Sequence, residues 1–185
     1  GSTNAVLHLL AIAREAGVAL DLADFDAISR TTPVLADLKP GGRYAAPDMT
    51  LAGGLRLVAQ RLLEQGRLHD GITVSGLSMH AEAAQAQERP GQQVLRTWSQ
   101  PLKSEGGIAI LRGTLAPDGC VAKLVGHDRR RHEGPARVFD SEDAAFAAVQ
   151  AGSIQPGDVI VIRHVGPAGA PGMPEMLAVT AALMG

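Results

Sequence analysis

An acid placed directly after a proline is the most distinctive chemical feature of this sequence. Glu175 follows Pro174 in the closing stretch GPAGAPGMPEMLAVTAALMG, just before an apolar run of helical character. Proline is favoured in the first turn of a helix, and the helix dipole keeps a carboxylate there ionised. An ionised oxygen ligand suits a hard cation such as Mg²⁺. The position also fits an acid that only complements the helix dipole, and spacing alone leaves both interpretations open.

Other side chains in the sequence could contact a small molecule. Asn4 and His8 lie one helical turn apart, so both could face one pocket. Lys39 and Arg43 flank a Gly-Gly turn and could hold a carboxylate. Each group has a plain structural alternative, because helix histidines and exposed loop cations are common. Cys120 is the only cysteine, so this chain alone cannot complete a cysteine-ligated metal or cluster site.

The composition narrows the class of protein. The chain has 185 residues, 45% of them hydrophobic, which allows one domain or two small ones. A net charge of -2 gives no broad electrostatic footprint for nucleic acid or an anionic membrane, and we expect the basic run at 129–131 to be a solvated loop. No stretch is apolar enough for a membrane span. One cysteine excludes an internal disulfide and fits a reducing compartment, so we expect a cytoplasmic protein.

The elements of the first half are predicted to be mostly helical. The apolar spacing indicates a helix over 6–13, with Ser2, Thr3 or Asn4 as its N-cap and Gly17 as its end. Further helices are predicted over 24–30, 51–65 and 78–87, with Gly66 ending the third. Residues 33–38 are expected to be extended before the turn KPGGRY, and GITVSG is expected to be a short β-type run.

The second half is predicted to be richer in strands. Residues 88–107 are polar and rich in Pro and Gly, which is typical of a connection between domains, and we place the boundary between 101 and 102. Strands are predicted over 108–111, 120–125, 137–139 and 159–163. One helix is predicted over 142–151, capped by Asp140 or Ser141 and ended by Gly152.

Five segments, in order, resemble one enzyme family. They are GSTNAVLHLLAIAREAGV, PVLADLKPGGRY, GGIAILRGTLAPDGCVAK, GPARVFDSEDAAFAAVQAG and PGDVIVIRHVGPAGAPGMPEMLAVTAALMG. Together they are similar to the middle and later part of the dihydroxy-acid dehydratases, a family that also contains sugar-acid and phosphogluconate dehydratases. The likeness covers essentially the whole chain. Mild departures are Thr114 where Asn is usual, Gly41 where Ser is usual, and SGLSMHAEA where a TGKT-like run is common.

The resemblance implies a fold and a set of cofactors. The expected fold class is α/β, with residues 1–101 forming the helix-rich end of an α/β cluster-binding domain. Residues 102–185 would begin a β-rich, swivelling-type (β/β/α) domain. An iron–sulfur cluster and Mg²⁺ would lie where the two domains meet, and the Glu of PGMPEM, here Glu175, would be a Mg²⁺ ligand. The cluster cysteines and a carbamylated lysine would lie upstream of residue 1, and the serine base beyond Gly185. No catalytic residue is therefore expected within the chain.

The implied reaction is the loss of water from a 2,3-dihydroxy acid to give a 2-oxo acid. As substrates we favour the branched dihydroxy acids of valine and isoleucine synthesis, with sugar acids as the alternative. We expect the intact enzyme to be a homodimer.

Because the chain opens without methionine and ends within an apolar helical pattern, we expect a fragment. As an alternative of another class, that fragment is non-catalytic and serves only as a binding or interface piece. The substrate-binding assignments are Ser2, Thr3, Asn4, His8 and Lys39.

Overall fold

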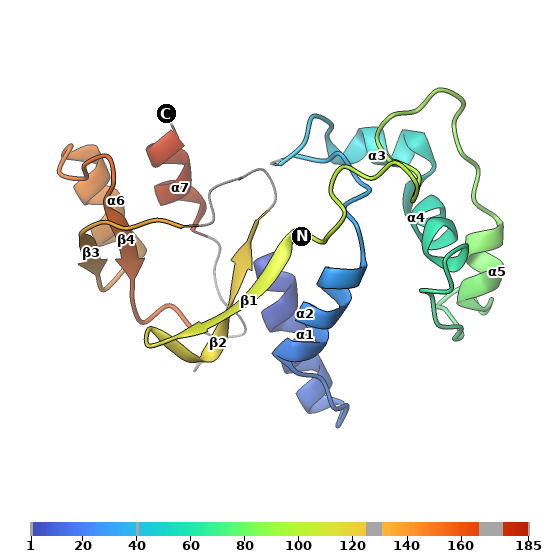
Figure 1. Cartoon of the computed structure of the whole chain (residues 1–185), viewed down its shortest axis with the longest axis horizontal. Helices are drawn as coiled ribbons and strands as arrows, with labels where there is room; N and C mark the ends of the chain where they lie inside the picture. Colours follow the sequence, from blue (N-terminus) through green and yellow to red (C-terminus); the bar gives the residue numbers. More distant parts are fainter. Residues whose placement is uncertain (1, 40, 125–130, 167–175, 185) are drawn as a thin grey trace. The chain divides into compact units, whose positions relative to one another are not determined.

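The chain forms two compact units, which are described separately. The computed structural model describes residues 2–39, 41–124, 131–166 and 176–184. One unit comprises Leu22–His127, and the other comprises Ser2–Asp21 together with Asp128–Gly185. Figure 1 shows helices and two small sheets, so the protein is mixed α/β. No helix in the described ranges has both the length and the apolar character needed to cross a bilayer.

The described part of the first unit contains four short helices and one apolar cluster. The residues buried in this cluster come from α3, α4, the segment between α2 and α3, and the segment between α5 and β1. Leu57 is fully buried, and Val94 and Leu95 pack into the same cluster from the later segment. The four helices are α2 (Leu22–Thr31), α3 (Ala46–Ala52), α4 (Gly54–Leu63) and α5 (Met79–Ala84).

Isolated bridges join the segment 34–38 to residues far along the chain. Val34 pairs with Lys103 and Ala36 pairs with Leu95, both in antiparallel fashion. The middle of the polar 88–107 stretch therefore contributes to the core of the first unit, and it is not an open linker. The domain boundary at 101/102 stays a prediction.

A two-stranded hairpin completes the first unit. Strands β1 (Ile108–Gly113) and β2 (Ala116–Lys123) pair antiparallel, and α2 packs against β1. The Ser29 hydroxyl donates to the Ile108 carbonyl at 2.6 Å, and the Gly106 N–H donates to the Ser29 carbonyl at 2.7 Å. These contacts fix the hairpin to the helix at the point where the chain enters β1.

In the second unit, the described residues form a parallel pair of strands and three helices. Strands β3 (Ala136–Phe139) and β4 (Val159–Ile162) are joined through α6 (Glu142–Gln150), which packs on both strands and on α7 (Leu177–Met184). A helix is the usual connection between parallel neighbours. Helix α1 (Thr3–Glu15) also belongs to this unit.

The glycine and serine signals in the sequence located several helix ends correctly. Ser2 caps α1 and Ser141 caps α6, while Gly17 and Gly152 follow these helices with positive φ angles of 67° and 65°. Helix α2 and strands β1 to β4 also occur where they were predicted, within a few residues. Helix α5 forms behind its Ser78 cap but is shorter than predicted.

Two predictions of local structure are wrong. The single helix expected over 51–65 begins at Ala46 and is broken at Gly53, whose φ of 141° is not helical. The stretch GITVSG is not a strand, because the Gly76 N–H donates to the Thr73 carbonyl and the chain folds back on itself. Only one bridge, Ile72 to Ser78, remains there.

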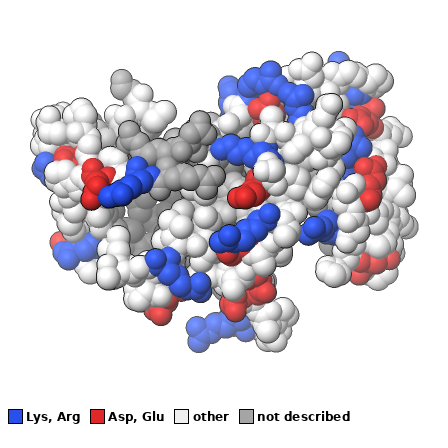
Figure 2. Space-filling view, viewed as in Figure 1, with Lys and Arg blue, Asp and Glu red and all other residues white. Residues whose placement is uncertain are grey.

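Charged side chains of both signs are interspersed over the surface in view. Figure 2 shows Lys and Arg next to Asp and Glu on this face, in keeping with the net charge of -2. Ion pairs occur among the described residues, for example between Arg56 and Glu82 at 2.8 Å.

Candidate functional site

The start of α1 presents polar groups without any competing acid. The Ser2 hydroxyl oxygen accepts from the Ala5 N–H at 3.3 Å, and no acidic residue lies in the first turn. Thr3 and Asn4 are half-buried and His8 is exposed one turn further on. Because helix N-termini favour negative charge, the chemistry of this end suits a carboxylate.

A second group of predicted residues lies on the turn 37–44 of the first unit. The Lys39 N–H donates to the Tyr44 carbonyl at 2.8 Å, and the Tyr44 N–H donates to the Asp37 carbonyl at 3.0 Å. Two backbone hydrogen bonds therefore close the turn. Lys39 is exposed, so the turn presents its ammonium group to solvent.

The buried carboxylate of Asp37 accepts two hydrogen bonds from within this turn. Asp37 is only 4% exposed, and its Oδ1 accepts from the Arg43 N–H at 2.9 Å while its Oδ2 accepts from Arg43 Nε at 2.7 Å. Burial works to raise the pKa of Asp37, but the Arg43 hydrogen bonds and the charges of Arg43 and Arg96 outweigh it, so the pKa lies below its ordinary value. The carboxylate is thus ionised and paired.

This pairing separates the roles of the two cations in the turn. Arg43 is engaged with Asp37 and also lies over the Tyr44 ring, 5.2 Å from its centroid. The hypothesis that Arg43 holds a substrate carboxylate is therefore disfavoured, and Lys39 is the cation that the turn offers. Sequence reasoning missed Asp37, because its burial and its pairing with Arg43 appear only in the folded structure.

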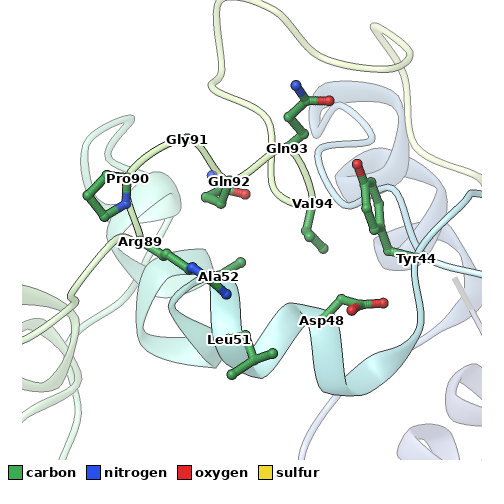
Figure 3. Close-up of a pocket in the computed structure, with 10 residues that line it drawn as sticks. All are labelled: Tyr44, Asp48, Leu51, Ala52, Arg89, Pro90, Gly91, Gln92, Gln93 and Val94. Carbon is green, nitrogen blue, oxygen red and sulfur yellow. The ribbon is translucent and has the colours of Figure 1, made fainter.

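An open groove of about 510 Å³ borders the turn through Tyr44. In Figure 3, Tyr44 and Asp48 lie on one side, and Arg89 reaches toward Ala52 from the other. The residues lining it come from α3 with its preceding turn and from the segment 89–94. Its volume suits a small molecule, and its wall carries hydroxyl, amide and charged groups.

Local hydrogen bonds fix two walls of this groove. Asp48 Oδ2 accepts from the Ala45 N–H at 2.8 Å, which caps α3. Gln92 uses its amide on the Leu95 backbone, accepting from the N–H at 2.9 Å and donating to the carbonyl at 2.8 Å. Gln92 also donates to Glu88, which accepts from the nearly buried Arg61 at 2.6 Å.

The predicted site residues that the structure describes lie in two separate groups. Ser2, Thr3, Asn4 and His8 lie together on the first two turns of α1, in the second unit. Lys39 lies in the first unit. Glu175 and most of the basic run at 129–131 lie outside the described residues.

The described residues do not by themselves form a metal centre. Within the described ranges, no three His, Cys, Asp or Glu side chains are grouped so as to hold a metal ion. Cys120 is exposed on β2. A single thiol does not match the several thiolates that an iron–sulfur cluster needs, so the residues present do not fit such a cluster.

Two family models cover the chain in order. The model described as Dihydroxy-acid/6-phosphogluconate dehydratase N-terminal matches residues 1–82, and its C-terminal counterpart matches residues 93–185. The chain belongs to the dihydroxy-acid/6-phosphogluconate dehydratase family.

Curated relatives agree with this assignment along the entire chain. Proteins named dihydroxy-acid dehydratase from Roseiflexus castenholzii, Koribacter versatilis and Thermus thermophilus are 57%, 58% and 57% identical to it. Each alignment covers 100% of this chain but only 32–34% of the relative. The chain therefore spans about a third of the length of the curated relatives that it matches.

Proposed function

We propose that the protein to which this chain belongs is a hydro-lyase that converts 2,3-dihydroxy carboxylic acids into 2-oxo acids. The observation that carries this proposal is the identity of 56–58% with several proteins named dihydroxy-acid dehydratase over the whole chain. The substrates we favour are the branched dihydroxy acids of valine and isoleucine synthesis. A sugar acid is the alternative, because the matched family also includes 6-phosphogluconate dehydratases.

The part of the reaction assigned to this chain is recognition of the substrate. All members of the substrate class carry a carboxylate, and two described sites offer donors to one. Ser2, Thr3, Asn4 and His8 surround a helix end without acidic residues, and Lys39 presents an ammonium group. We assign these five residues to substrate binding. Their donors would hold the carboxylate and the neighbouring hydroxyl groups in place while water is lost.

Two cofactors belong to the proposal through the family resemblance. Mg²⁺ would stabilise the negative charge that develops next to the substrate carboxylate. Glu175, which lies outside the described residues, is proposed as one of its ligands. The iron–sulfur cluster would take its thiolates from other parts of the protein, since this chain has one cysteine. We accordingly propose that the 185-residue chain alone takes up no cluster and shows no turnover.

The same resemblance supports the remaining proposals. Residues 1–101 would belong to the cluster-binding domain and residues 102–185 to a swivelling-type domain, in a cytoplasmic homodimer. These assignments concern the whole protein.

The proposed activity is tested on the full-length protein after anaerobic cofactor reconstitution. Formation of 2-oxo acid from 2,3-dihydroxyisovalerate is compared with its formation from gluconate and 6-phosphogluconate. A kcat/KM that is at least about 100-fold higher for the branched acid supports the favoured substrate, since discrimination between ligands of different polarity reaches this scale. A preference for gluconate would select the alternative. Failure to dehydrate any of the three would refute the proposal.

A further inference from the structure

We propose that Asp37, Gly42 and Arg43 are positioning residues that hold the two arms of the turn, 37–39 and 42–44, together and thereby aim the Lys39 ammonium at the substrate carboxylate. This inference rests on the proposed function, in which Lys39 contacts the substrate. It adds a specific division of labour within the turn. One cation, Arg43, maintains the shape of the turn, and the other, Lys39, makes the contact.

The backbone gives the first reason. Two backbone hydrogen bonds close the turn. The Lys39 N–H donates to the Tyr44 carbonyl, and the Tyr44 N–H donates to the Asp37 carbonyl. The segment on the N-terminal side of the turn is anchored as well, because the Asp37 N–H donates to the carbonyl of the buried Val94 at 2.8 Å. The backbone of Lys39 is therefore fixed to the core of the first unit.

The Asp37 carboxylate gives the second reason. Both its oxygens accept hydrogen bonds from a single residue, Arg43, one from the backbone and one from the side chain. Asp37 is 4% exposed, so water cannot readily replace these donors. Removing the guanidinium would leave a buried carboxylate short of partners, and the turn would relax to rehydrate it.

Gly42 gives the third reason, because it lets the chain approach the carboxylate closely. A Cβ atom at position 42 would lie 2.5 Å from the Asp37 carbonyl carbon and 2.5 Å from Oδ1. Real Cβ atoms do not approach other heavy atoms this closely, and the nearest obstacle includes backbone. Glycine is thus required by the close approach of the two arms of the turn.

A fixed backbone at Lys39 would favour recognition of a ligand by its exposed side chain. Ordering a flexible loop on binding costs free energy that is subtracted from the affinity for the ligand. Because the backbone on which Lys39 sits is already fixed, only its side chain must be ordered when the carboxylate arrives. The effect of Asp37, Gly42 and Arg43 should therefore appear in substrate binding more than in the chemical step.

The experiment compares variants of the full-length protein. Lys39→Met, Arg43→Met and Arg43→Lys are assayed for KM and kcat, and calorimetry gives the Kd of the 2-oxo acid product. We expect Lys39→Met to raise KM and Kd about 10-fold or more, the scale of one hydrogen bond to a charged group. Arg43→Met should raise both several-fold with little change in kcat. Arg43→Lys should fall between Arg43→Met and the wild type.

A matched control and a double variant make the result specific. Arg30 forms an exposed ion pair with Asp26 at 2.7 Å, so Arg30→Met removes a similar pair away from the turn and should leave KM unchanged. The Lys39→Met/Arg43→Met protein should bind no worse than Lys39→Met alone, because Arg43 acts through Lys39. Melting temperatures identify any variant that fails to fold, and Arg43→Lys then decides the matter.

The outcomes separate this inference from the proposed function. If Lys39→Met raises KM but neither Arg43 variant does, the positioning role is overturned and Lys39 keeps its role. An unchanged KM and Kd in Lys39→Met would overturn both roles while leaving the dehydratase activity standing. If Arg43→Met raises KM equally in the presence and absence of the Lys39 side chain, Arg43 does not act through Lys39 and the inference is wrong.

Discussion

Arg163 directs two donors, Nε and Nη2, at a single oxygen of Asp140, at 2.8 and 2.6 Å. Asp140 follows β3 and Arg163 follows β4, so the pair joins the carboxyl ends of two parallel strands. The Arg163 N–H also donates to the Phe139 carbonyl at 2.8 Å. Both side chains are more than half exposed, and such pairs contribute at most about 1 kcal/mol. The pair therefore contributes little to the stability of the fold.

His164, which follows Arg163, adopts an uncommon backbone conformation. His164 has a φ of 60°, in the left-handed region where a side chain is disfavoured. We expect His164→Val to destabilise the protein by about 1–2 kcal/mol, because a β-branched side chain crowds the backbone there. His164→Gly should be neutral or slightly stabilising. Urea denaturation measures both, and equal destabilisation by Val and Gly would show that the imidazole ring matters more than the backbone.

Gly42 should be intolerant of even one added carbon. Gly42→Ala places a methyl group against Asp37, so we expect a loss of about 1–3 kcal/mol in the free energy of unfolding, the usual range for overpacking. Gly71→Ala is the control, because a Cβ at that position meets no heavy atom within 4 Å. Thermal and urea unfolding compare the two variants. Similar stabilities would mean that the turn rearranges without cost.

Asp37 should make stability depend on pH in the acid range. Its pKa is lowered in the folded state, so the unfolded chain binds the proton at higher pH than the folded chain does. The contribution is therefore fully present above the ordinary Asp pKa of about 3.9 and is lost as the pH falls through the lower folded value. The stability difference between wild type and Asp37→Asn should shrink between about pH 5 and pH 2. Urea titrations at several pH values measure it; a constant difference contradicts the expectation.

Glu175 should be essential to the full-length enzyme if it is a Mg²⁺ ligand. Glu175→Gln keeps the size of the side chain but removes its charge, so Mg²⁺ affinity should fall and kcat should drop about 100-fold or more. Manganese binding, followed by electron paramagnetic resonance, gives a readout that is independent of turnover.

Glu142→Gln is the matched control, because Glu142 lies in the first turn of α6 and should act only as a helix-dipole partner. Such a partner contributes about 0.3–1 kcal/mol to stability and nothing to catalysis. Near-normal turnover and manganese binding in Glu175→Gln would place Glu175 in the same class as Glu142.

Local signals explain which parts of the fold were predictable. Ser2 and Ser141 cap helices, and Gly17 and Gly152 end them, because capping depends on neighbouring residues alone. Gly53 was missed because a glycine within an apolar helical pattern is often tolerated, and its role here depends on packing: a Cβ at this position would lie 2.9 Å from the Leu57 side chain.

The site was less predictable, for a physical reason. Lys39 was assigned to substrate binding from its residue type and its turn; it is exposed, and its contact with substrate stays a prediction. The partner of Arg43 was not predicted, because the burial of Asp37 arises from tertiary packing: its exposed fraction is 4%, and its N–H donates to the carbonyl of the distant Val94. A single sequence shows local chemistry directly, but it does not show which charges become buried.

The one thiol of this chain lies in a useful place. Cys120 is exposed on β2, opposite Leu111 of β1, and no other cysteine competes with it within the 185 residues. A maleimide-linked fluorophore or a nitroxide would therefore attach at a single known position without any mutagenesis. Its anisotropy or line shape would follow the motion of the β1–β2 hairpin and provide a spectroscopic handle on the first unit alone.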